Sequence, residues 1–262
     1  SNRRDARVRA RSGYWAPLPS ELRAATRLMT TPLLPTRALK RSPYIESWFG
    51  LTVEPDGQRR VIFTWMPVAS KQPARSKPNA RPDVVALKVT TPAGALLFEG
   101  EVGSARLGTG SSVRPSSAVF QTTPGRLQFD LTILQADGTR LDVGAMDFDV
   151  PGVRGANPVI LPPQVFRAQS AREFRDLIAD VNAAPVPDRE FRRTERLLLR
   201  VPTFEPGGNA VQVSAKLVNR VGTLVLVLAP MSPLNEEAGQ KLTQFDLPLA
   251  RFAPGEYLIE VA

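Results

Sequence analysis

Three aspartates near the middle of the chain come closest to a pattern that could do chemistry. Asp142, Asp147 and Asp149 fall in one strand-like stretch, and Asp147 and Asp149 share a face because side chains alternate along a strand. Carboxylates grouped in this way can bind calcium or cleave glycosidic bonds. No glycine-punctuated ligand loop surrounds them. We therefore interpret all three as solvent-facing and predict no metal site.

Other catalytic patterns are missing from the sequence. Gly103–Ser112 is rich in glycine and serine, but it lacks the Gly-Lys-Ser/Thr ending of a phosphate-binding loop and no helical pattern follows it. The absence of cysteine and histidine removes thiol nucleophiles, disulfides and the commonest general base. No nucleophile-elbow or Ser-x-x-Lys motif is present. We predict that the protein is not an enzyme and has no catalytic residue and no cofactor.

The aromatic side chains of the first strand-like segments leave two interpretations open. Tyr44, Trp48, Phe63 and Trp65 would form a platform for a sugar ring if they were exposed. Tryptophan in a β-sandwich is typically a central packing residue, so we favour a place in the core. A carbohydrate- or cell-envelope-binding module that uses exposed aromatics is the alternative function.

The net charge of +9 belongs to one end of the chain. Residues 1–41 hold ten basic and two acidic side chains, a net charge of +8, whereas residues 42–262 carry only +1. The body therefore lacks the basic surface of a nucleic-acid-binding protein, and we expect no nucleic-acid partner. Arg7, Arg9 and Arg11 alternate with period two, which favours a strand with arginine on one face or a solvated arm. These three are the candidate contacts for an anionic partner.

Short strands separated by turns must position these side chains. The sequence contains 25 prolines and turn motifs such as Pro92-Ala93-Gly94 and Asp137-Gly138, which argue against long helices. The first half predicts strands over residues 44–53, 60–68, 84–90, 95–102, 118–121, 127–134 and 140–150. Seven strands in roughly 110 residues are typical of an immunoglobulin-like or fibronectin-III-like sandwich.

The second half shows a similar pattern interrupted by one helix. Strands are predicted over residues 159–167, 197–201, 211–219, 223–228, 244–249 and 256–262. The helix is predicted over residues 170–178, where Ser170 and Glu173 match a capping box. Another short helix, over residues 20–29, is predicted ahead of all the strands because Pro19 and Ser20 form a helix start.

An internal repeat supports two similar domains. Residues 124–131 and 254–261 each place a Pro-Gly turn before a strand with apolar residues at alternate positions, and Tyr257 stands where a tyrosine corner would. The first copy continues into one more strand, whereas the second ends at Ala262. We expect the second domain to lack its final strand and to expose an edge that invites pairing with another chain, a second copy included. The candidate interaction residues are Glu256, Tyr257, Leu258, Ile259, Glu260 and Val261.

Five segments resemble the bacterial VWFA-related secreted proteins, which carry a von Willebrand factor A domain. Residues 8–15 are similar to the closing strand and exit of that domain, and the segments similar to the region after it are residues 44–51, 63–68, 191–198 and 249–257. The Asp-x-Ser-x-Ser metal loop of the A domain does not occur in this sequence, so no metal site is carried over. The resemblance implies an extracytoplasmic protein in which this segment is a C-terminal accessory region.

The expected organisation has three parts. Residues 1–42 are a basic lead-in made of a remnant strand and a short helix, residues 43–152 the first sandwich, and residues 153–262 the second. The expected function is that of a non-catalytic extracytoplasmic structural or protein-interaction module, whose partner is the neighbouring A domain or an envelope protein. No apolar run approaches the roughly 20 residues that cross a bilayer, so we expect no transmembrane segment.

Overall fold

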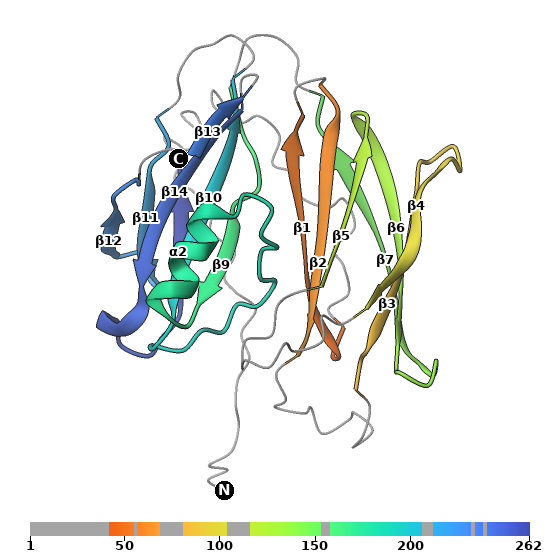
Figure 1. Ribbon diagram of the computed structural model, residues 1–262, viewed down its shortest axis with the longest axis horizontal. Helices are drawn as coiled ribbons and strands as arrows, with labels where there is room; N and C mark the ends of the chain where they lie inside the picture. Colours follow the sequence, from red (N-terminus) through yellow and green to blue (C-terminus); the bar gives the residue numbers. More distant parts are fainter. Residues whose placement is uncertain are drawn as a thin grey trace, which may run out of the picture. The chain divides into compact units, whose positions relative to one another are not determined.

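The fold is all-β, as the sequence predicts. The computed structural model describes residues 42–54, 57–68, 81–103, 116–152, 158–205, 212–231, 234–237 and 240–262. Within these residues the strands form four antiparallel sheets, and one α-helix accompanies them (Figure 1). The helix predicted over residues 20–29, Arg7, Arg9 and Arg11, and nearly all of the 103–112 stretch lie outside the described residues.

The first half contains the seven predicted strands. They are β1 (Ile45–Val53), β2 (Arg59–Pro67), β3 (Val84–Thr90), β4 (Leu96–Gly103), β5 (Ser116–Thr122), β6 (Gly125–Leu134) and β7 (Arg140–Val150). One sheet has the order β1-β2-β5 and the other the order β4-β3-β6-β7. The predicted bounds of β3 and β7 are confirmed residue for residue.

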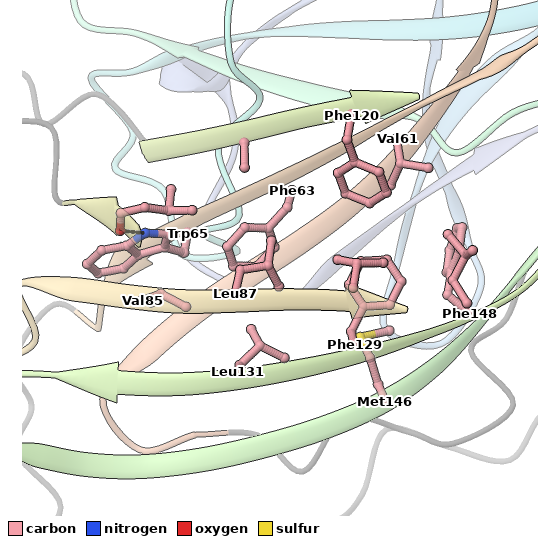
Figure 2. Close-up of a cluster of buried hydrophobic side chains, with 14 of the residues drawn as sticks. Val61, Phe63, Trp65, Val85, Leu87, Phe120, Phe129, Leu131, Met146 and Phe148 are labelled. Atoms are coloured by element: carbon pink, nitrogen blue, oxygen red, sulfur yellow. Dashed lines mark hydrogen bonds between the residues drawn. The ribbon is translucent and has the colours of Figure 1, made fainter. Parts of the chain in front are cut away.

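Alternating apolar side chains fill the space between these two sheets. Strand β6 shows the pattern most clearly, because Leu127, Phe129, Leu131 and Ile133 are buried while the residues between them face outward. Phe129 meets Phe49 of the opposite sheet edge-on, with ring centroids 4.9 Å apart. Figure 2 shows Phe63, Phe120, Phe129 and Phe148 gathered in this core.

Trp65 joins the two sheets of the first half. Its side chain is fully buried, and its indole Nε1 donates a hydrogen bond of 2.9 Å to the carbonyl oxygen of Val102 (Figure 2). Trp65 belongs to β2 and Val102 to β4, so the bond crosses from one sheet to the other. A buried indole N–H needs such a partner, because leaving it unpaired costs free energy.

The second half forms two further sheets. Its strands are β8 (Val159–Ile160), β9 (Gln164–Ala168), β10 (Arg196–Phe204), β11 (Ala215–Asn219), β12 (Leu224–Leu228), β13 (Leu234–Glu237), β14 (Gln240–Pro248) and β15 (Tyr257–Val261). One sheet has the order β13-β14-β10-β8, with β9 also pairing with β10, and the other has the order β12-β11-β15. Among the described strands, those of the first half pair only with one another, and so do those of the second half.

Several predicted boundaries in the second half were wrong. The strand expected over residues 159–167 is broken into β8 and β9, because Pro162 and Pro163 between them cannot donate backbone hydrogen bonds. Strand β10 runs on through Pro202, which lies where its pairing passes from β9 to β8. Strand β11 begins at Ala215, β14 begins at Gln240, and β13 was not predicted at all.

Helix α2 (Ala171–Ala179) covers the outer face of the sheet that contains β10. The Ser170 Oγ accepts a hydrogen bond of 3.1 Å from the Glu173 N–H, and the Glu173 carboxylate accepts one of 2.8 Å from the Gln169 N–H. The predicted cap is therefore confirmed, with its return bond one residue earlier than in a standard capping box. Phe174 of α2 packs with Phe166 and Leu198 in a small second core.

A buried arginine ties the end of α2 to this sheet. The Arg200 side chain is fully buried; its Nη1 donates a 3.0 Å hydrogen bond to the Asp180 carbonyl and its Nη2 donates to the Leu177 carbonyl. The guanidinium lies 4.5 Å from the centre of the Phe166 ring. Burial lowers the pKa of Arg200 to about 10, opposed by the nearby Asp180 carboxylate, and this leaves the group charged at neutral pH.

Replacing the buried indole tests the bond between the sheets. We expect Trp65→Phe to lower the free energy of unfolding by about 2–4 kcal/mol, because it opens a cavity and leaves the Val102 carbonyl without its buried partner. Urea denaturation measures the change. The matched control is Trp48→Phe, since Trp48 is half-buried on the outer face of the same sheet and lies over Gly50. Equal losses in the two variants would contradict the special role of Trp65.

Replacing Arg200 tests the attachment of α2. We expect Arg200→Met to cost about 2–3 kcal/mol, because methionine retains much of the packing but leaves two helix-end carbonyls unpaired. Below pH 10 the arginine is charged in both the folded and the unfolded chain, so the loss should be equal at pH 6 and pH 8. Urea denaturation at both pH values, with hydrogen exchange of the α2 amides, measures this. A neutral or stabilising substitution would contradict it.

Candidate functional site

Strand β15 lies at the edge of its sheet, as the sequence predicts. It pairs with β11 in the register Lys216–Glu260 and Val218–Leu258, and β12 pairs with the far side of β11. No described strand pairs with the other side of β15. The structure thus brings the predicted interaction residues of β15 together on one open edge, with Glu256 immediately before the strand.

The backbone of β15 presents every second residue to this open edge. The Ala262 and Ser214 backbones exchange hydrogen bonds of 2.8 and 3.0 Å, so they form a doubly bonded pair. Because bonded residues alternate along an antiparallel ladder, Glu260 and Leu258 also direct their N–H and C=O groups to β11. The N–H and C=O groups of Tyr257, Ile259 and Val261 therefore point away from β11, toward the side where no described strand lies.

The inward side chains of the same three residues are incompletely covered. In β6 the equivalent positions Leu127 and Phe129 are 1% and 0% exposed, because β7 lies beside them. Tyr257, Ile259 and Val261 also pack against their core but remain half-buried. An inward-facing side chain is covered from both flanks only when its strand has a neighbour on each side, and β15 has one described neighbour.

The outer face of this sheet combines exposed aliphatic side chains with one lysine–glutamate ion pair. Its cross-strand rows are Leu224–Val218–Leu258 and Val227–Lys216–Glu260. Val218 is 2% exposed at the centre, whereas Leu258 and Val227 are 60% and 63% exposed. Five of the ten exposed large apolar residues in the described chain belong to β12, β15 or the turn after β11: Val221, Leu224, Val225, Val227 and Leu258. Half of the exposed large apolar side chains of the described residues are therefore concentrated on or beside this one sheet.

Two glutamates supply the negative charge of the edge. The Glu260 carboxylate lies 2.7 Å from the Lys216 ammonium, which balances it on the outer face. The Glu256 carboxylate lies 3.6 Å from the Arg220 guanidinium, but both side chains are largely exposed and solvent screens the pair. Glu256 is therefore the carboxylate at this edge that is most available to an incoming cation.

A tyrosine corner fixes the start of β15. The Tyr257 hydroxyl donates a hydrogen bond of 2.9 Å to the carbonyl oxygen of Ala253, four residues earlier. The Tyr257 ring also contacts Phe252, with ring centroids 5.8 Å apart. The corner predicted from the sequence is confirmed, and it holds the edge strand in place at the end where Glu256 lies.

Arg167 and Arg196, which pair with each other's neighbours across β9 and β10, make structural contacts. The Arg167 guanidinium lies 2.8 Å from the Asp188 carboxylate and stacks 4.9 Å from the Phe191 ring. Arg196 makes a two-pronged ion pair with Asp246, at 2.7 and 2.5 Å, and covers the Phe174 ring of α2. These contacts fasten loops and α2 to the sheet.

Two of the four aromatic side chains considered for a sugar platform are buried. Phe63 and Trp65 are 0% exposed, whereas Tyr44 and Trp48 are half-buried. The exposed large apolar side chains of the described residues are all aliphatic. The core interpretation is confirmed for Phe63 and Trp65, and the burial of these two side chains removes half of the platform required by the alternative function.

The three aspartates of β7 are not brought together. Asp147 and Asp149 share the outer face, opposite Gln128 and Arg126, whereas Asp142 lies near the other end of the strand. The Asp147 carboxylate accepts a 2.5 Å hydrogen bond from Arg126 and raises the pKa of that guanidinium. Among the described residues, no three acidic side chains gather as a metal site would require.

A shallow hollow of about 480 Å³ lies between the edges of β4 and β5. Its lining includes Phe98, Glu101 and Ser117, which offer one carboxylate and one hydroxyl. The 104–115 segment that joins the two strands lies outside the described residues, so we assign this hollow no chemistry.

Neither comparison with known proteins identifies a relative. No model of a protein family matches the chain, and a search of curated proteins finds no match. In the described part of the chain, no helix is long and apolar enough to cross a bilayer.

Sequence reasoning located the β15 edge but missed the apolar face beside it. The signal was the unbroken run Leu224–Leu228, which is apolar at every position and therefore cannot hide all its side chains on one face. It also missed Arg200, because nothing in a strand sequence distinguishes a buried arginine from an exposed one.

Removing one hydroxyl tests whether the tyrosine corner holds the edge strand. We expect Tyr257→Phe to lower the free energy of unfolding by about 1 kcal/mol and to speed exchange of the Leu258 and Glu260 amides, since the bond to Ala253 is lost. Tyr44→Phe is the control, because the Tyr44 hydroxyl makes no described hydrogen bond. Unchanged exchange in β15 would contradict the anchoring role.

Proposed function

We propose that this chain is a non-catalytic, extracytoplasmic protein-interaction module that receives a strand of a partner protein at the β15 edge. The observation that carries the proposal is that the N–H and C=O groups of Tyr257, Ile259 and Val261 face no described strand, in a sheet whose outer face exposes aliphatic side chains. Strand addition at such an edge supplies main-chain hydrogen bonds for affinity and side-chain contacts for specificity.

The strand order supports a fibronectin-III-like assignment for the first half. Its first, second and fifth strands share one sheet, and its fourth, third, sixth and seventh share the other. An immunoglobulin constant domain differs in that its fourth strand joins the first sheet. The connections therefore cross between the sheets as in a Greek-key sandwich. The difference is that the fourth strand lies beside the third instead of in the sheet of the first strand.

The second half supports the same assignment strand by strand. Strands β9, β10 and β14 correspond to β1, β2 and β5, while β12, β11 and β15 correspond to β4, β3 and β6. The described residues contain no counterpart of β7. We propose that both halves are fibronectin-III-like sandwiches.

The extracytoplasmic location and the neighbouring von Willebrand factor A domain rest on the sequence resemblance alone. The absence of an enzymatic role is also an inference, motivated by the lack of histidine and cysteine and by the structural roles of the described charged clusters. No observation on the described residues favours the carbohydrate-binding alternative.

Amide exchange in β15 tests directly whether the full chain accepts an added strand. The probe is a synthetic peptide with the sequence of residues 140–150, the strand that occupies the equivalent position in the first half. We expect the amides of Tyr257, Ile259 and Val261 to exchange fast in the free chain and to become protected when the peptide is added. The Leu258 and Glu260 amides, which already face β11, serve as the internal reference.

Two variants of Ile259 separate the contribution of its backbone N–H to peptide binding from that of its side chain. Ile259→Pro removes an N–H that faces the open edge and leaves the β11 bonds intact, so it should abolish peptide binding. Ile259→Ala truncates the same side chain but keeps the N–H, and it should still bind. Circular dichroism confirms that each variant is folded. Equal binding by both, or no protection of the edge amides in the parent chain, would refute strand addition.

A further inference from the structure

Strand β12 forms the edge of its sheet on the side opposite β15 (Figure 1). Among the described strands it pairs only with β11. The described chain continues on both sides of β12, over residues 219–223 and 229–231, so this edge lies in the interior of the chain. Its open side is therefore a property of the sheet topology.

The backbone of Val227 faces the open side of β12. Lys216 of β11 directs its N–H and C=O groups to β15, through its pair with Glu260. Val227 lies opposite Lys216 on the other flank of β11, in a pair that is consequently not hydrogen-bonded. The N–H and C=O groups of Val227 therefore point away from β11, toward a side where no described strand lies.

The side chains of β12 are aliphatic on both faces. Leu224, Val225 and Val227 are 55%, 40% and 63% exposed, whereas Leu228 is buried in the core of the second half. No charged residue occurs anywhere in residues 221–235. Edge strands of native proteins are usually blunted by charged side chains, because an apolar edge pairs readily with another strand.

The corresponding edge strand of the first half, β4, carries this protection. One cross-strand row matches between the halves, namely Asp130–Lys88–Glu99 in the first and Glu260–Lys216–Val227 in the second. Glu99 lies 3.8 Å from the Lys88 ammonium, and Glu101 of the same strand is also exposed. Two copies that met through β4 would bring four carboxylates together, whereas two that met through β12 would bring none.

We propose that β12 is a self-association edge, at which the β12 strand of a second copy of this chain pairs in the antiparallel direction. A two-fold axis perpendicular to the sheet relates two such edges and makes the strands antiparallel. Every residue of Leu224–Leu228 is aliphatic, so each register of the two strands sets aliphatic side chains against one another and buries no charge.

Charge complementarity favours a second copy as the occupant. An incoming strand must be uncharged along its whole length, since a charge placed beside β12 would lose water without gaining an ionic partner there. A second β12 meets this condition by its own sequence. The nearest charged row, Lys216–Glu260, is an ion pair of 2.7 Å in each copy and is already balanced. The inference is independent of the proposed function, because β15 is the opposite edge of the sheet.

Sedimentation of the full chain tests the proposal. We expect a monomer–dimer equilibrium with a dissociation constant on the order of 100 µM, because a pair of short strands makes a small interface. Val227→Lys places a charge at the position of Glu99 and should raise the dissociation constant at least about tenfold. The matched control is Val143→Lys, the same substitution at a valine of β7 that is 56% exposed, and it should leave the equilibrium unchanged.

A proline variant tests the backbone bonds of the same edge. Val227→Pro removes an N–H that faces the open side and leaves the β11 bonds intact, so it should abolish the dimer, whereas Val227→Ala keeps the N–H and should retain it. Circular dichroism confirms folding. In the parent chain, exchange of the Val227 amide should slow as concentration rises, with the Leu226 and Leu228 amides, which face β11, as the internal reference.

Three results would overturn the proposal. The first is a parent chain that stays monomeric up to about 1 mM, well above the expected dissociation constant. The second is a dimer that both Val227→Lys and Val227→Pro retain, which would place the contact elsewhere on the chain. The third is a dimer that Ile259→Pro dissociates and Val227→Pro does not, which would assign self-association to β15.

Discussion

Each sheet of this protein has to bury one apolar face, and the alternation of side chains along a strand is the constraint on which the rest of the structure depends. In the first half, Leu127, Phe129 and Leu131 are the buried side chains of one sheet, and Phe63 and Trp65 are buried side chains of the other. Side chains of the two faces pack into one buried cluster, and the Trp65–Val102 hydrogen bond adds one directional link between the layers. Neither sheet could remain folded with its inner face in water.

In strand β10, buried and exposed side chains do not alternate. Seven of its nine residues are buried, because α2 covers the face that solvent would otherwise reach. Covering that face places Arg200 in a dry environment, where its guanidinium takes the carbonyls at the end of α2 as partners. The cost of burying one charge is offset by the helix-end groups that it satisfies. Arg167 and Arg196 act in the same way at the margin of the sheet, with carboxylates as their partners.

The edges of the sheets are protected unequally. Strand β7 carries Asp142, Asp147 and Asp149, and charged residues on an edge discourage the addition of another strand. Strand β15 carries one charged residue, Glu260, and Lys216 already neutralises it. Leu258 faces solvent on the outer side, and the inner side chains are half-covered. Strand β15 corresponds to β6 in the repeat and not to β7, so these two edge strands differ in their place in the sheet as well as in their charge.

Local pattern was enough to locate most of the strands and the edge. Period-two alternation and turn residues are properties of short segments, so β3, β7, the α2 cap and the tyrosine corner at Tyr257 could all be read from neighbouring residues. The break between β8 and β9 was missed although Pro162 and Pro163 mark it in the sequence. The short β13 was missed because its residues become a strand by pairing with β14.

The sequence by itself determined the all-β class, the repeat and the identity of the candidate edge, because these follow from the order of residue types along the chain. Only the tertiary structure decided which side chains are buried. It placed Trp65 in the core and Trp48 on an outer face, buried Arg200 beneath α2, and left Leu258 of β15 and Val227 of β12 exposed. Burial depends on what covers a face, and the covering element comes from another part of the chain.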